Sequence, residues 1–173
     1  MKITLKPLGD VDNNITETLK VELHKIFGCP VRSIPNCEIT NKAHDSKREQ
    51  YLASSLLKTI EESGQVQNER VLGIVDVDLY APGLNYIFGE AHINSGTAII
   101  SLCRLRQEYY GLSPDEDLFI NRTVKEAVHE LGHTFGLTHC SDLKCVMHFS
   151  NSLADTDWKS PTFCSQCRPK LLK

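Results

Sequence analysis

The sequence lacks long hydrophobic runs, internal repeats and low-complexity segments. Its longest apolar stretches, at residues 72–75 and 98–102, are far shorter than the about 20 residues that a membrane-spanning helix needs. Lys2, Lys6 and Pro7 interrupt the N-terminus before the apolar core of a signal peptide can form. We therefore expect a cytoplasmic protein without a membrane partner.

The chain also lacks a strong excess of charge of one sign. Its 19 lysines and arginines against 22 aspartates and glutamates give a net charge of −3, which argues against general binding of nucleic acid. A length of 173 residues suits one domain, 1–173, with room for a hydrophobic core that does not depend on disulfides. We expect this domain to be a monomer.

The number of cysteines is seven, which is odd. In a chain without an export signal, the reducing cytosol disfavours a framework of disulfides. Four of the seven lie within residues 140–173. This clustering favours a bound metal over disulfide bonds.

Hydrophobic periodicity predicts strands that alternate with helices. The expected strands are residues 1–8, 31–39, 71–80, 84–91 and 97–105. The expected helices are residues 14–27, 45–63 with Gly64 as its stop, one that begins near residue 123, and 164–173. Residues 94–96 supply turn chemistry for a hairpin between the last two strands. This order predicts an α/β (α+β) sandwich with a mixed sheet.

The third helix has recognisable ends. Thr123 and Glu126 match a capping box, which places the start of the helix there or slightly earlier. Val128 and Leu131 then form its inner face, and Gly136 can end it in a left-handed conformation.

This helix carries the pattern with the clearest chemistry. His129 and His133 are four residues apart, so their side chains share one helix face and can reach one metal ion. Gly136 lets the chain turn so that His139 returns to the same ion. Three protein ligands leave a fourth position open, as catalytic zinc sites require.

Glu130 stands next to the first histidine, where it can contact a water on the metal without being a ligand itself. Zinc lowers the pKa of a bound water to roughly 7 and polarises a carbonyl. Glu130 would take the proton of that water and pass it to a leaving amine, as a general base and then a general acid. The pattern therefore predicts zinc-dependent hydrolysis.

A second metal site is predicted just after the histidines. Its ligands are two cysteine pairs, with spacing C-x4-C and C-x2-C separated by 18 residues: Cys140, Cys145, Cys164 and Cys167. Four thiolates suit a closed, tetrahedral structural zinc. We expect two zinc ions per chain, with the second stabilising a subdomain within residues 140–173.

The fixed positions from His129 to Cys167 resemble those of the archaemetzincin family, and the likeness extends upstream over most of the chain. The resemblance implies a compact metzincin-like catalytic domain, a mixed sheet with one antiparallel edge strand and a long active-site helix. It also implies a peptidase, an aminopeptidase being one option, that acts on peptides or small proteins. Met147, eight residues after His139, matches the methionine of the turn beneath the zinc ligands in metzincins.

Two alternatives stay open. The strand 84–91 could pair with an extended substrate, or its edge could be covered by other parts of the protein. The whole chain could be a zinc-stabilised module that binds protein or nucleic acid without hydrolysis, although such a module would not need Glu130.

Three further residues receive no role from the pattern. Asp76 and Asp78 alternate along an expected strand, and the simpler interpretation is that they hydrogen-bond neighbouring loops. His148 follows Met147, but a fourth histidine would block the open metal position, so it is left out of the ligand set.

Overall fold

A computed structural model describes residues 1–62 and 69–172. Its main feature is a five-stranded sheet. In spatial order the strands are β2 (Val31–Ser33), β1 (Lys2–Leu8), β5 (Glu69–Val75), β8 (Thr97–Ser101) and β7 (Gly89–His92). The first four are mutually parallel and β7 is an antiparallel edge strand, which confirms the expected mixed sheet.

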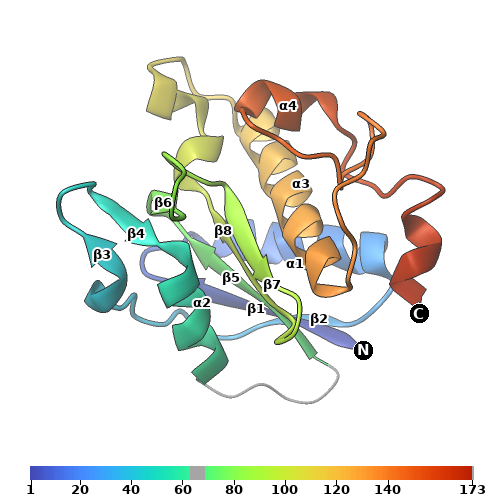
Figure 1. Cartoon of the computed structure of the whole chain (residues 1–173), viewed down its shortest axis with the longest axis horizontal. Helices are drawn as coiled ribbons and strands as arrows, with labels where there is room; N and C mark the ends of the chain where they lie inside the picture. The colour runs from blue at the N-terminus through green and yellow to red at the C-terminus, as the bar shows by residue number, and fades with distance from the viewer. Residues whose placement is uncertain (63–68, 173) are drawn as a thin grey trace.

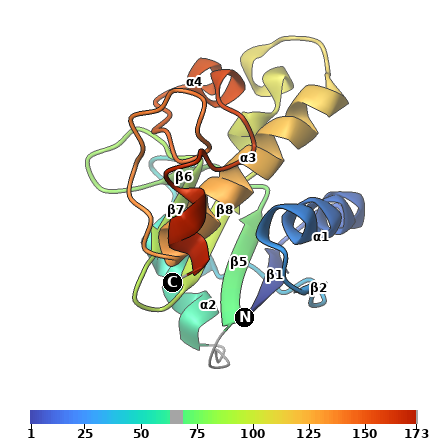
Figure 2. The same ribbon diagram turned by 90° about the vertical axis from the view of Figure 1, so that its right-hand side faces the viewer.

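Helices cover both faces of this sheet (Figures 1 and 2). Helices α1 (Asn13–Phe27) and α3 (Glu116–Thr134) pack on one face, and α2 (Ala53–Glu62) packs on the other. Strand β8 shows why. Ala98 and Ile100 belong to the core on the α1–α3 face, whereas Ile99 belongs to the core on the α2 face, because alternate side chains point to opposite sides.

The remaining elements are short. A second sheet has the strand order β3 (His44–Asp45), β4 (Gln50–Leu52) and β6 (Leu79–Tyr80). The 3-10 helices are η1 (Asn41–Ala43), η2 (Cys103–Leu105), η3 (Gln107–Tyr110) and η4 (Arg168–Leu172), and the last α-helix is α4 (Leu153–Trp158). Arg122 of α3 donates two hydrogen bonds of 2.7 Å to the Asp157 carboxylate, which fixes α4 above α3.

The expected helix over residues 45–63 was wrong in its first half. Residues 44–52 form β3, a turn and β4, and the helix begins only at Ala53. Glu49 in that turn has a φ of 54°, which a helix does not allow. The predicted stop at Gly64 lies outside the described residues.

The expected strands were also too long. The strand predicted for 31–39 ends at Ser33, shortly before Pro35, which has no N–H to donate to a ladder. The strand predicted for 71–80 ends at Val75, so Asp76 and Asp78 lie in a loop rather than on a strand face.

The predicted hairpin is present but shorter than expected. Strand β7 replaces the predicted 84–91, and β8 ends at Ser101 rather than at residue 105. The turn between them contains Gly96 with a φ of 66°, as the turn chemistry predicts.

Both ends of the C-terminal third of the chain differ from expectation. Helix α3 begins at Glu116, seven residues before Thr123, because Asp115 caps it by accepting from the Leu118 N–H. The hydroxyl of Thr123 instead donates to the Phe119 carbonyl within the helix. The predicted final helix over 164–173 is the short 3-10 helix η4, and residue 173 is not described.

Within the described ranges 1–62 and 69–172, every helix is too short or too polar to cross a lipid bilayer.

Candidate active site

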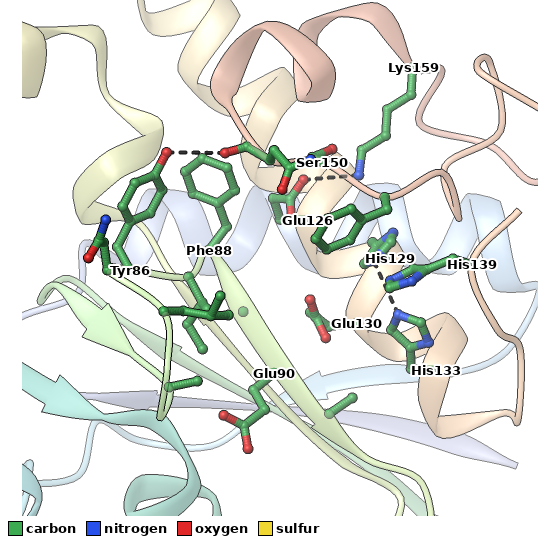
Figure 3. Close-up of a pocket in the computed structure, with 18 of the residues that line it drawn as sticks. Tyr86, Phe88, Glu90, Glu126, His129, Glu130, His133, His139, Ser150 and Lys159 are labelled. Atoms are coloured by element: carbon green, nitrogen blue, oxygen red, sulfur yellow. Dashed lines mark hydrogen bonds and ion pairs between the residues drawn. The ribbon is translucent and has the colours of Figure 1, made fainter. Parts of the chain in front are cut away.

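Three histidines meet at the C-terminal end of α3. The Nε2 atoms of His129 and His133 are 3.1 Å apart, and one nitrogen from each of the three rings, including that of His139, lies within 4.8 Å of the others. Zinc–nitrogen bonds of about 2.0–2.1 Å in a tetrahedral site place nitrogens about 3.4 Å apart. The three rings are thus arranged to share one ion, and Figure 3 shows them converging.

Backbone carbonyls fix the orientation of two of these rings. Nδ1 of His129 lies 2.7 Å from the Val146 oxygen, and Nδ1 of His133 lies 2.7 Å from the Leu137 oxygen. Each Nδ1 is therefore the N–H donor, which leaves Nε2 free to bind a metal. Gly136 has a φ of 82°, which confirms the left-handed turn that brings His139 back.

Burial sets the protonation of the histidines. Loss of solvation lowers the pKa of His129 well below its usual range, and Lys159 lowers it further. Burial also lowers the pKa values of His133 and His139. Neutral imidazole is the form that binds metal, so the site favours the ligand state at neutral pH.

Glu130 is buried beside this cluster and lines the same cavity. Burial raises the pKa of its carboxyl well above the usual range, and the neighbouring Glu126 raises it further. Strand β7 lies against it. A Cβ atom on Gly89 would come 2.6 Å from Cγ of Glu130 and 2.7 Å from the Ile99 carbonyl oxygen, so only glycine fits there.

Met147 packs against helix α3 at Gly132. It is fully buried, and a Cβ atom on Gly132 would meet its sulfur at 2.4 Å. Gly132 lies between the two helical histidines in the sequence, so the helix and the turn that carries Met147 make close contact. The Cys140 N–H also donates to the Met147 carbonyl, which closes the turn.

The four C-terminal cysteines form a second cluster. One sulfur from each of Cys140, Cys145, Cys164 and Cys167 lies within 4.8 Å of the others. Sγ of Cys140 is 3.8 Å from Sγ of Cys164. Zinc–sulfur bonds of about 2.3 Å in a tetrahedron place sulfurs about 3.8 Å apart, so this spacing fits a four-thiolate zinc.

The sequence is similar to that of known peptidases. The sequence profile of peptidase family M54 matches residues 9–173. The archaemetzincin of *Methanocaldococcus jannaschii* is 41% identical over 172 residues, covering 99% of this chain and 93% of the relative. The archaemetzincin of *Pyrococcus furiosus* is 44% identical over 175 residues, covering 98% and 91%.

Solved structures agree with the sequence comparison. The crystal structure of archaemetzincin from *Archaeoglobus fulgidus*, complexed with malonate, has a TM-score of 0.85 and 38% identity over 98% of this chain and 99% of that chain. A zinc-dependent peptidase from *Methanocorpusculum labreanum* has a TM-score of 0.90 and 30% identity over the same shares.

The chain belongs to the archaemetzincins, peptidase family M54. As a member, it is a zinc metallopeptidase whose substrates are peptides. Family membership decides between the two functions left open by the sequence, because it favours the hydrolase over a module that only binds. It also confirms the α/β metzincin-like fold.

The cleft of this archaemetzincin is a cavity of about 600 Å³ between β7 with its preceding loop, α3 and the loop after Met147. His129, His133 and His139 line it together with Glu130. Its rim is apolar and exposed, with about half of each of these side chains open to solvent: Leu84, Ile93 and Phe149. An apolar rim around a polar centre suits an extended peptide.

The structure gives hydrogen-bond partners to the three residues that had no predicted role. Asp78 receives hydrogen bonds from Arg104 and Gln50, and Asp76 pairs with Arg106, so both carboxylates are used in the loop network. Nδ1 of His148 lies 2.9 Å from the Cys140 carbonyl oxygen, apart from the group of three histidines.

Sequence reasoning missed Glu126, Ser150 and Lys159, which also line the cleft. Glu126 precedes Glu130 by one helical turn, a spacing that could have flagged it. Ser150 and Lys159 lie in loops whose path only the fold determines.

Proposed function

We propose that His129, His133 and His139 hold the catalytic zinc, and that Cys140, Cys145, Cys164 and Cys167 hold a second, structural zinc. The spacing of ring nitrogens and of sulfurs, together with the carbonyls behind two of the rings, supports this assignment. Two zinc ions per chain follow from it.

The reaction is peptide hydrolysis, with Glu130 as general base. A zinc ion at the histidines supplies Lewis acidity, which acidifies water and polarises the scissile carbonyl. Glu130 accepts the proton of the attacking water and delivers it to the leaving amine. The observation that carries this role is the position of Glu130: its buried carboxylate lines the cavity beside the three rings and packs on Gly89.

Strand β7 positions the substrate. It is the edge of the five-stranded sheet, and Gly89, Glu90 and Ala91 line the cavity. An extended peptide that pairs with this edge by strand addition has its backbone beside Glu130 and the histidines. Side chains that alternate along the peptide then point into the cavity or out to solvent.

The aminopeptidase option has a direct test. Glu90 lines the cavity, but its register opposite Ile99 puts its side chain on the α2 side of β7, where its carboxylate lies 3.5 Å from Nε2 of His92. The test therefore depends on the substrate's N-terminus and not on this carboxylate. Cleavage of free but not of N-acetylated peptides would support exopeptidase action, and equal cleavage of both would exclude it.

The test of the central proposal is a digest of a diverse peptide mixture by the wild type and by Glu130→Gln, followed by mass spectrometry. We expect zinc content to be equal in the two proteins, and cleavage to fall by about 10²–10⁴-fold in the variant. Glu116→Gln, at the exposed start of the same helix, is the matched control and should keep full activity. Full activity of Glu130→Gln would remove Glu130 from the mechanism.

A further inference from the structure

The three histidines of the active site differ in what holds their rings. His129 and His133 lie on helix α3, and each has a backbone carbonyl oxygen 2.7 Å from its Nδ1. His139 lies in the loop after the helix and is exposed to solvent. In the part of the chain that the structure describes, no carbonyl or carboxylate forms a hydrogen bond with the His139 ring.

A ligand ring that rotates freely weakens a metal site. Histidine has two side-chain torsions, and a metal ion that binds must fix both of them at a cost in conformational entropy. A partner that holds the ring beforehand reduces this cost, and the loss of such a partner typically weakens metal binding by about 10–100-fold. For His129 and His133 this partner is a carbonyl oxygen, so the corresponding partner of His139 is of a different kind.

The ring of Phe149 lies against that of His139. Their centroids are 4.8 Å apart and their planes are inclined by 51°. The His139 ring also contacts those of His129 at 5.4 Å and His133 at 4.9 Å, which are proposed ligands themselves. Among the described residues, Phe149 is therefore the one aromatic contact of His139 outside the ligand set. Ring contacts at such distances favour particular relative orientations of the two rings.

The backbone that leads to Phe149 is itself fixed. The Cys140 N–H donates to the Met147 carbonyl at 2.9 Å, and Nδ1 of His148 lies 2.9 Å from the Cys140 carbonyl oxygen. Met147 is fully buried. These contacts hold the segment before Phe149 beside the residue that follows His139, so the two rings are kept together before a metal binds.

The exposure of Phe149 indicates a role in the site rather than in the core. Both Phe149 and His139 line the cleft, and Phe149 is 48% exposed. A half-exposed side chain at a cavity rim adds little to the stability of a fold. Its contact with His139, in contrast, bears directly on how that ring is oriented.

We propose that Phe149 is a positioning residue, which orients the His139 ring for zinc binding where the other two histidines have a hydrogen bond. Phe149 acts on the metal through His139. This inference rests on the proposed function for the assignment of His139 as a zinc ligand, and it adds the residue that holds this ligand.

The test measures zinc affinity rather than turnover. Wild type, Phe149→Ala, Phe149→Tyr and His139→Ala are equilibrated with chelator buffers that fix a graded series of free zinc concentrations, and zinc per chain is counted by metal analysis. His139→Ala identifies the binding step that belongs to the histidines, because the four-thiolate site should keep its ion. At that step we expect Phe149→Ala to bind zinc about three- to tenfold more weakly than the wild type. Phe149→Tyr keeps the ring and should stay within about twofold.

Two controls separate this effect from a loss of structure. Leu112 is 60% exposed and lies in the loop before α3, outside the cavity, so Leu112→Ala should bind zinc as the wild type does. The thermal midpoint of unfolding is measured at a free zinc concentration that fills only the cysteine site. It should agree within about 2 °C between wild type and Phe149→Ala, because a half-exposed side chain is removed.

Equal zinc affinity in Phe149→Ala and wild type, or an equal loss in Phe149→Ala and Phe149→Tyr, would overturn the positioning role and leave the ligand set intact. A raised KM for peptides with unchanged zinc affinity would also overturn it, because Phe149 would then contact the substrate instead. Unchanged zinc affinity in His139→Ala would refute the proposed ligand set itself, and this inference with it.

Discussion

The histidine cluster and the cysteine cluster are adjacent in the sequence, at His139 and Cys140, but differ in construction. The histidines come mainly from one long helix, and their rings face a cavity of about 600 Å³. The cysteines come from two loops without a helix or strand between the members of either pair, and Cys145 and Cys167 are buried. One cluster has a side open to ligands, whereas the other is enclosed by its own four sulfurs.

This difference in construction suits the histidine cluster to a reaction and the cysteine cluster to a structural role. A helix holds its side chains in place without a metal, so the histidine cluster can leave one coordination position for reaction. No helix or strand lies between the members of either cysteine pair, so a metal there contributes to folding directly. The contact from Cys140 N–H to the Met147 carbonyl joins the two sites mechanically.

The largest effect is expected from Cys164→Ser. Structural zinc contributes about 10–16 kcal/mol in small zinc-binding peptides, so we expect a loss of more than about 3 kcal/mol in unfolding free energy. Catalytic zinc occupancy should fall as well, although Cys164 is not one of the three histidine ligands. Metal analysis and denaturant titration measure both effects. Cys37→Ser, far from the cluster, should change neither, and full catalytic zinc in Cys164→Ser would refute the coupling.

His139→Ala tests the histidine cluster, and it should remove activity with little loss of stability. His139 is exposed and packs on Phe149 at the cavity rim, so its loss should cost less than about 1 kcal/mol of stability. Activity should fall by at least about 10³-fold because the ion loses a ligand. Zinc content should drop from two ions to one. Unfolding of this variant would mean that the histidine site is also structural.

Gly89→Ala sharpens the role assigned to β7. The new Cβ atom would overlap Glu130, so the carboxylate must move. A displacement of about 1 Å in an active site can cost about 10²-fold, and we expect a loss of this size in kcat/KM with zinc content unchanged. Activity within twofold of the wild type would show that Glu130 tolerates the shift.

The smallest effect concerns the loop that joins the two metal sites to α4. Asp155 completes a capping box with Ser152, and the Ser152 hydroxyl holds the pKa of the Asp155 carboxyl below its usual range. A lowered pKa in the folded state means that this contribution is present above the pKa of an ordinary aspartate and is lost as the pH falls through the lower value. Asp155→Asn should therefore destabilise by up to about 1 kcal/mol at pH 7 and by less in acid, measured by urea titration. An equal difference at both pH values would contradict this assignment.

The sequence allowed the two metal clusters to be predicted because their geometry is local. Helical periodicity brings His129 next to His133, and short spacings bring each cysteine pair together. The parallel core strands were predicted in kind because apolar, β-branched runs are typical of buried strands. Their ends were not, since they depend on partners such as the short parallel register of β2.

Other features depend on contacts between distant residues. Lys159 and Glu126 are 33 positions apart and meet only because Arg122 and Asp157 hold α4 over α3. The start of α3 was misplaced for a related reason, because the pattern at Thr123 competes with the stronger cap at Asp115. Gly89 gave no signal, because its role is to leave room for a side chain from another element.

The carbonyl that orients His129 belongs to Val146, and η4 reaches back to α1 through a hydrogen bond from Arg168 to the Ile26 carbonyl. A nascent chain that has left the ribosome only as far as its third histidine therefore has every imidazole of the cluster but not the carbonyl that orients His129. Proteolytic capacity should consequently arise late in synthesis, which protects the growing polypeptide and its neighbours from premature cleavage.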